Sequence, residues 1–134
     1  MFCLDASVII SAARGGESAS TRSRAFLNLL KEEGAKAFLP EIAITEVASG
    51  LFRATKRVDF SYLFARTLRD IPNFSFVAVD ARLADLAAAI AVRTGLRSAD
   101  AIYAALAYDY NLTLVTLDRE QLSRTRDLVI VRQP

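Results

Sequence analysis

The chain of 134 residues contains no histidine, no tryptophan and only one cysteine. The absence of histidine excludes Ser-His-Asp triads and the usual zinc or iron sites built on imidazole. Any metal must therefore be held by oxygen ligands, which select Mg²⁺, Mn²⁺ or Ca²⁺. The single cysteine, Cys3, cannot form an intramolecular disulfide, and its apolar neighbours predict a buried thiol.

Long uncharged apolar runs are also missing from the sequence. No stretch approaches the ~20 apolar residues of a membrane span. The first apolar run reaches Asp5 too early to be a secretory signal. We therefore expect a cytoplasmic protein, in a reducing compartment and without a membrane partner.

Lysine is scarce: the 17 basic residues comprise three lysines and 14 arginines, and the net charge is only +2. Arginine binds phosphate through two parallel hydrogen bonds and stacks on bases, so an arginine-rich surface suits a phosphate-bearing partner. A bias of the genome or of the growth temperature would produce the same composition. Composition alone leaves both interpretations open.

Apolar and charged residues make up 53% and 24% of the chain, as in an ordinary globular domain, and we expect one domain over residues 1–134. Short apolar runs alternate with segments of helical periodicity, which predicts an α/β fold with a central parallel sheet of about four to five strands. The strands are expected at 2–4, 36–39, 74–79, 112–116 and 128–131. Helices are expected around 8–10 and at 21–33, 41–55, 60–69, 80–94 and 98–107, with a helical turn from Asp118. Ser98 is expected to cap the helix at 98–107, and Gln121, three residues after Asp118, to complete a capping box. The buried stripe of the helix at 60–69 is expected to comprise Phe60, Leu63, Phe64 and Leu68. The segment 14–20 is expected to be a flexible loop.

Acidic residues stand at the ends of these predicted elements. Asp5 ends the first strand, Asp118 lies just past the fourth, and Asp100 lies in the first turn of a helix. In open α/β sheets, sites form outside the carboxyl ends of the strands, so these acids meet if the two strands are neighbours. Each also has an ordinary interpretation, since Asp5 and Asp118 are good helix caps and Asp100 favours a helix dipole.

A fourth acid, Glu46, lies in the middle of an apolar helical segment. Glu46, Gly50, Arg53 and Arg57 share one helix face at steps of four, three and four. We expect a substrate backbone to approach at Gly50 while Arg53 and Arg57 hold its phosphates. Otherwise Glu46 is simply a solvated helix position.

Four segments in this order and at these intervals resemble the PIN domain family, which comprises Mg²⁺-dependent nucleases and includes the VapC toxins of toxin–antitoxin pairs. The segments are LDAS at 4–7 followed by VII, Glu46 after an apolar strand and Pro40, SADAI at 98–102, and LVTLD at 114–118. The resemblance covers the whole chain and shows no departure at the four acids.

The resemblance implies a three-layer α/β/α domain with metal-dependent endoribonuclease activity. The implied catalytic and metal-binding residues are Asp5, Glu46, Asp100 and Asp118, around Mg²⁺ with Mn²⁺ as a substitute. Asp5 and Asp100 are the first candidates for direct contact, and Thr116 and Ser7 are implied to orient the site. Four carboxylates in one pocket repel each other, and a divalent cation removes that conflict. The implied reaction is in-line attack of water on a phosphodiester, which leaves a 5′-phosphate and a 3′-hydroxyl.

The implied partners are RNA, a small antitoxin and a second copy of the chain. The candidate dimer surface is the aromatic helix around Tyr62. The arginines expected to bind RNA, each with a solvated charge as the alternative, are Arg53, Arg57, Arg97 and Arg119, with Arg14, Arg22 and Arg24 as further surface candidates. A housekeeping RNA-processing nuclease and a non-catalytic RNA-binding PIN-like protein remain open as alternatives to a toxin.

Two other Mg²⁺-binding α/β classes fit the sequence less well. A receiver-type signalling module needs adjacent acids after the first strand and a lysine late in the chain. The first strand supplies one acid, and no lysine follows Lys56. A phosphatase with a nucleophilic aspartate needs an acid two residues after Asp5, where Ser7 stands.

Overall fold

The structure is a computed structural model that describes residues 1–16 and 18–134. Five strands form one parallel sheet in the order β3-β2-β1-β4-β5. Their bounds are β1 Phe2–Leu4, β2 Ala37–Pro40, β3 Phe74–Val77, β4 Thr113–Val115 and β5 Val131–Arg132. The predicted parallel sheet of four to five strands is therefore confirmed, although β5 begins three residues later than expected.

Seven α-helices are described, and a short 3₁₀ turn, Leu68–Asp70, follows α4. The helices are α1 Ala6–Arg14, α2 Ser18–Glu32, α3 Ile42–Thr55, α4 Val58–Thr67, α5 Ala81–Thr94, α6 Ser98–Asp109 and α7 Arg119–Arg124. No helix in the described part of the chain is both long and apolar enough to span a bilayer.

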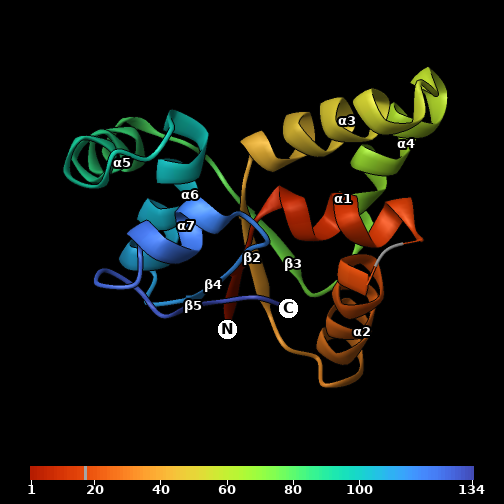
Figure 1. The fold of residues 1–134 in the computed structure, drawn as a ribbon, viewed down its shortest axis with the longest axis horizontal. Helices are drawn as coiled ribbons and strands as arrows, with labels where there is room; N and C mark the ends of the chain where they lie inside the picture. The colour runs from red at the N-terminus through yellow and green to blue at the C-terminus, as the bar shows by residue number, and fades with distance from the viewer. Residues whose placement is uncertain (17) are drawn as a thin grey trace.

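The helices cover the sheet in two layers. Helices α1 to α4 lie on one side of the sheet and α5 to α7 on the other (Figure 1). The chain winds outward from β1 through β2 to β3 and then crosses back through α5 and α6 to β4, on the other side of β1. The predicted three-layer α/β/α arrangement is confirmed, and the winding direction reverses between β1 and β4.

The core is centred on β1 and β4. Cys3, Leu4, Leu114 and Val115 are fully buried, as expected for inner strands covered on both faces. Helix α6 packs across the sheet with alanines, which let its backbone approach closely, and its alanines at 101, 104, 105 and 107 are all fully buried. This packing fixes the start of α6 beside the carboxyl ends of the two central strands.

Three local expectations were wrong. The loop expected over 14–20 ends at Ser18, where α2 begins, and Glu17 lies outside the described residues. Ser98 does not cap α6, because Arg97 is the extended residue before the helix and makes no capping hydrogen bond through its side chain. Leu63 was expected in the buried stripe of its helix, but it is 59% exposed, because α4 turns Ser61 and Ala65 to the core instead.

Candidate active site

The pairing of β1 with β4 brings two of the predicted acids together. Leu4 is in register with Val115, and the backbone N–H of Asp5 donates to the carbonyl of Val115 at 3.0 Å. Asp5 and Asp118 therefore leave neighbouring strands at the point where the winding of the sheet reverses. This is the ligand-binding position expected for an open parallel sheet.

The side chain of Asp5 is almost fully buried and is held by hydroxyl groups. Thr116 Oγ1 donates to Asp5 Oδ2 at 2.9 Å, and the hydroxyl and backbone N–H of Ser7 donate to the same oxygen. Burial raises the pKa of Asp5, and these hydrogen bonds oppose the rise without cancelling it. The same contacts make Asp5 the cap of α1, so the ordinary interpretation of this residue is compatible with a site role.

Ser7 and Thr116 also fix the loop that carries Asp118. Ser7 Oγ accepts the backbone N–H of Leu117 at 3.1 Å, and Thr116 Oγ1 accepts that of Asp118 at 2.9 Å. Each hydroxyl therefore connects Asp5 to the end of β4. These contacts are compatible with the orienting role that the family resemblance implies for Ser7 and Thr116.

Arg97 connects the two remaining aspartates. Its Nε donates to Asp100 Oδ2 at 2.9 Å, and its terminal nitrogen donates to Asp118 Oδ2 at 3.2 Å. The other oxygen of Asp118 caps α7 by accepting the backbone N–H groups of Glu120 and Gln121. Arg97 was expected to bind RNA, whereas here its guanidinium neutralises acids of the site.

Gln121 is a site residue that the sequence analysis identified only as part of a capping box. Its side chain is fully buried and donates to Asp100 Oδ1 at 2.9 Å instead of returning to the helix start. Asp100 thus has one oxygen held by Gln121 and the other by Arg97. The capping pattern marked the position of Gln121, but its partner Asp100 lies 21 residues earlier in the sequence and meets it only in the folded protein.

Glu46 enters from α3, and Tyr103 on α6 holds it. The Tyr103 hydroxyl donates to Glu46 Oε2 at 2.6 Å. Burial raises the pKa of Glu46, and the charges of Asp5 and Asp100 raise it further, while the Tyr103 hydrogen bond and Arg53 act in the opposite direction. Glu46 is therefore close enough to the other acids to feel their charge. Tyr103 was not among the site residues predicted from the sequence, because it lies in an alanine-rich helix with only apolar residues directly beside it.

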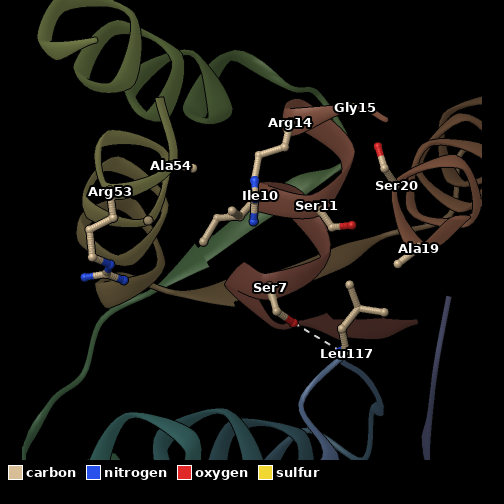
Figure 2. Close-up of a pocket in the computed structure, with 11 residues that line it drawn as sticks. Ser7, Ile10, Ser11, Arg14, Gly15, Ala19, Ser20, Arg53, Ala54 and Leu117 are labelled. Carbon is tan, nitrogen blue, oxygen red and sulfur yellow. Dashed lines mark hydrogen bonds between the residues drawn. The ribbon is translucent and has the colours of Figure 1, made fainter. Parts of the chain in front are cut away.

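All four predicted acids line one cavity of about 500 Å³, the acidic pocket. Ser7, Arg53 and Arg97 line it too. A second cavity of about 580 Å³ adjoins it, and the two share Ser7, Ile10 and Arg53. Figure 2 shows this second cavity between α1, α3 and the start of α2.

The expected face of α3 is only partly realised. Arg53 lines both cavities, but Arg57 lies over the ring of Phe60, with its guanidinium carbon 4.9 Å from the ring centre, and lines neither. Arg119 lines neither cavity. Gly50 lines the second cavity, and a Cβ there would clash with Cδ1 of Ile10. The missing side chain therefore allows α3 to pack closely on α1 at the wall of the second cavity.

The donor set of the acidic pocket fits a hard divalent cation in its chemistry. All four acids offer oxygen ligands, and the mutual repulsion that raises the pKa of Glu46 is what a cation relieves. Among residues 1–16 and 18–134, however, no three acidic or cysteine side chains are arranged so that they could hold an ion. Arg97 occupies one oxygen of Asp100 and one of Asp118, so these two ligands become available only when its guanidinium moves.

Comparison with known proteins gives the following. A sequence model of the PIN domain matches residues 2–128. A search among curated proteins finds no significant match. Among solved structures, FitAcB from Neisseria gonorrhoeae has 25% identity and a TM-score of 0.72, covering 98% of this chain and 96% of that one. PAE2754 from Pyrobaculum aerophilum has 26% identity and a TM-score of 0.69, covering 97% and 89%. The Mycobacterium tuberculosis toxin VapC20, described as cleaving the sarcin–ricin loop, has 16% identity and a TM-score of 0.80, covering 98% and 99%.

The raised pKa values of Asp5 and Glu46 predict how stability depends on pH. A carboxyl group with a raised folded-state pKa contributes stability below its unfolded pKa, and that contribution is lost as the pH rises through the folded value. In EDTA, the protein should therefore be more stable at mildly acidic than at neutral pH. Glu46→Gln should raise the melting temperature at pH 7 by a few degrees and flatten this dependence, as measured by calorimetry.

Asp109→Asn is the matched control for that measurement. Its partner Arg82 lowers the pKa of Asp109, so the sign is opposite and this variant should not gain stability at pH 7. If Glu46→Gln instead lowered the melting temperature at neutral pH, the charged carboxylate of Glu46 would not destabilise the parent protein.

Proposed function

The chain belongs to the PIN domain family, and from this premise we propose that it is a metal-dependent endoribonuclease that hydrolyses RNA phosphodiester bonds. The observation that carries the proposal is the convergence of Asp5, Glu46, Asp100 and Asp118 on one pocket beside the central strands. These four residues come from four separate segments of the chain. Stability alone gives no reason to gather four carboxylates whose charges repel each other.

We propose Mg²⁺, with Mn²⁺ as a substitute, held by the four carboxylates, with Asp5 and Asp100 as the first direct ligands. When bound, the cation would activate water and stabilise charge on the phosphate. Ser7 and Thr116 hold Asp5 in place through Oδ2. Tyr103 occupies Oε2 of Glu46, so Oε1 is the atom that would accept a proton from the attacking water, a role that its raised pKa suits.

We further propose that the protein is the toxin of a toxin–antitoxin pair and binds a small antitoxin protein. Support comes from the solved structures that resemble it, which include VapBC2 from Rickettsia felis bound to promoter DNA and VapBC from Salmonella typhimurium bound to DNA. A cytoplasmic location follows from the proposed substrate. Cellular RNA is the chemical partner that an arginine-rich surface beside an acidic pocket fits.

Asp5→Asn should abolish cleavage while it preserves the fold. The change removes one ligand charge but keeps the shape of the side chain and its contact with Thr116. We expect a labelled single-stranded RNA to be cut by the parent protein in Mg²⁺ or Mn²⁺, and at least a hundredfold more slowly by the variant or in EDTA, the order of loss seen when a main electrostatic contributor to catalysis is removed (roughly 10²–10³). In a bacterial host, the parent alone should arrest growth.

The two readouts separate the alternatives. Cleavage without growth arrest would favour a housekeeping processing nuclease. RNA binding without cleavage, in both metals and with several RNAs, would favour the non-catalytic binder. Equal cleavage by Asp5→Asn and the parent would remove Asp5 from the catalytic set.

Arg97 should compete with the metal for two carboxylates. If so, Mg²⁺ raises the melting temperature of the parent by binding the folded state, and Arg97→Gln shows the same rise at a severalfold lower concentration. Thermal shift titration measures both without any RNA. Arg82→Gln is the control, because Arg82 pairs with Asp109 outside the acidic pocket. Equal Mg²⁺ requirements for the Arg97 and Arg82 variants would rule out competition.

We propose a homodimer through the end of α3 and the face of α4. Four apolar side chains are between 42% and 66% exposed there, namely Phe52, Val58, Tyr62 and Leu63. Such a group of exposed apolar side chains in one region is typical of a protein–protein interface. Tyr62→Glu should shift the protein from dimer to monomer in sedimentation velocity. Val92→Glu, at an 85% exposed apolar position on α5, should not. A monomeric parent at micromolar concentration would overturn the proposal.

A further inference from the structure

The second cavity, beside the acidic pocket, has no role in the proposed chemistry. This cavity, the arginine trough, is bordered by α1, α3 and the first turn of α2. It meets the acidic pocket at Ser7, Ile10 and Arg53, so the two cavities form one continuous depression. Its volume of about 580 Å³ lies within the roughly 300–1,000 Å³ of ligand cavities.

Positive charge is concentrated along the trough. Arg14 and Arg53 line it, and in Figure 2 the side chain of Arg14 runs back along α1 toward Ile10, between Arg53 and Ser11. Arg24 stands at its rim, with a guanidinium nitrogen 3.7 Å from where a Cβ of Gly15 would lie. Within the described residues, the trough is lined by no acidic side chain. The charged side chains of the described lining are thus opposite in sign to the four acids of the acidic pocket.

Apart from Ile10, Leu117 and the two arginines, the described residues that line the trough have small side chains or none. Ser11, Gly15, Ala19 and Ala54 line it, and no aromatic residue does so in the described part of the chain. Small side chains admit a bulky backbone, while the lack of aromatic rings removes the stacking platforms on which proteins hold single-stranded bases. Paired guanidiniums are the groups that bind phosphate oxygens best. The trough therefore matches a sugar–phosphate backbone better than it matches bases.

We propose that the arginine trough binds the sugar–phosphate backbone of the RNA strand on one side of the scissile bond. Arg53 holds the strand at the junction with the acidic pocket, and the guanidinium of Arg14, which reaches back toward Ile10, holds it within the trough. This assignment rests on the proposed ribonuclease function and adds the path of the strand across the protein. Phosphate contacts position a nucleic acid without reading its sequence, so the trough contributes affinity and register but no base preference.

Binding of RNA to proteins that carry Asp5→Asn, which prevents cutting, tests the proposal directly. Fluorescence anisotropy with two labelled single-stranded RNAs of equal length and unrelated sequence gives the dissociation constants. Arg14→Gln should raise the dissociation constants of both RNAs by roughly tenfold, the loss of affinity expected for one charge-assisted hydrogen bond. The slope of log affinity against log salt should become shallower by ~0.7 for each phosphate that the variant no longer neutralises. Arg126→Gln, an exposed arginine beyond α7, is the charge-matched control and should change neither value.

A second pair of variants adds a negative charge, whereas the first pair removes a positive one. Ala54→Glu places a carboxylate in the trough, at an exposed helix position that tolerates glutamate. It should reduce the affinity for both RNAs at least as much as Arg14→Gln does. Ala88→Glu, at an exposed position of α5, adds the same charge elsewhere and should have little effect.

The outcomes separate the trough from the proposed function. If the Asp5→Asn protein binds neither RNA, the proposed ribonuclease function itself is in doubt. If it binds RNA but the trough variants match their controls, the trough assignment is wrong while the function stands. Weaker binding of only one of the two RNAs would mean that the trough reads bases, which also overturns the assignment.

Discussion

The parallel pairing of β1 with β4 is the contact on which the rest of the site depends. The register of these two strands places Asp5 and Asp118 at one edge of the sheet, and the crossover through α5 and α6 delivers Asp100 and Tyr103 to the same place. Helix α3 then supplies Glu46 from the other layer. A shift of that register would separate Asp5 from Thr116 and from the end of β4, because a one-residue slip reverses which face each side chain takes.

The repulsion among the four carboxylates costs free energy, and hydrogen bonds from neighbouring side chains offset part of that cost. Hydroxyl groups hold Asp5, a tyrosine holds Glu46, and an arginine spans Asp100 and Asp118. Burial still raises the pKa of Asp5 and Glu46, so these contacts leave part of the cost uncompensated. Residual strain of this kind is common where binding of a charged ligand supplies what the protein lacks.

The part of this arrangement that depends on local sequence could be predicted. Strand ends, the acid after each strand and the Asp118 cap follow from patterns a few residues long. The contacts of Gln121 and Tyr103 could not, because each joins residues far apart in the sequence that only the tertiary fold brings together. Gly50 illustrates the same limit. Helical periodicity places Gly50 on the same face as Glu46 and Arg53, but the side chain that packs against it is Ile10, from the beginning of the chain.

The opposite charges of the two cavities resolve a difficulty that the acids create. Four carboxylates repel a polyanion, and a divalent cation neutralises only part of their charge. A strand of RNA therefore needs positive charge close to the acidic pocket but outside it. An arginine inside the pocket would pair with the acids, as Arg97 does. Arg53 stands at this boundary: it lines both cavities and its charge lowers the pKa of Glu46. The net charge of +2 conceals this separation, because it is the placement of the arginines and not their excess over acids that would draw a phosphate chain toward the carboxylates.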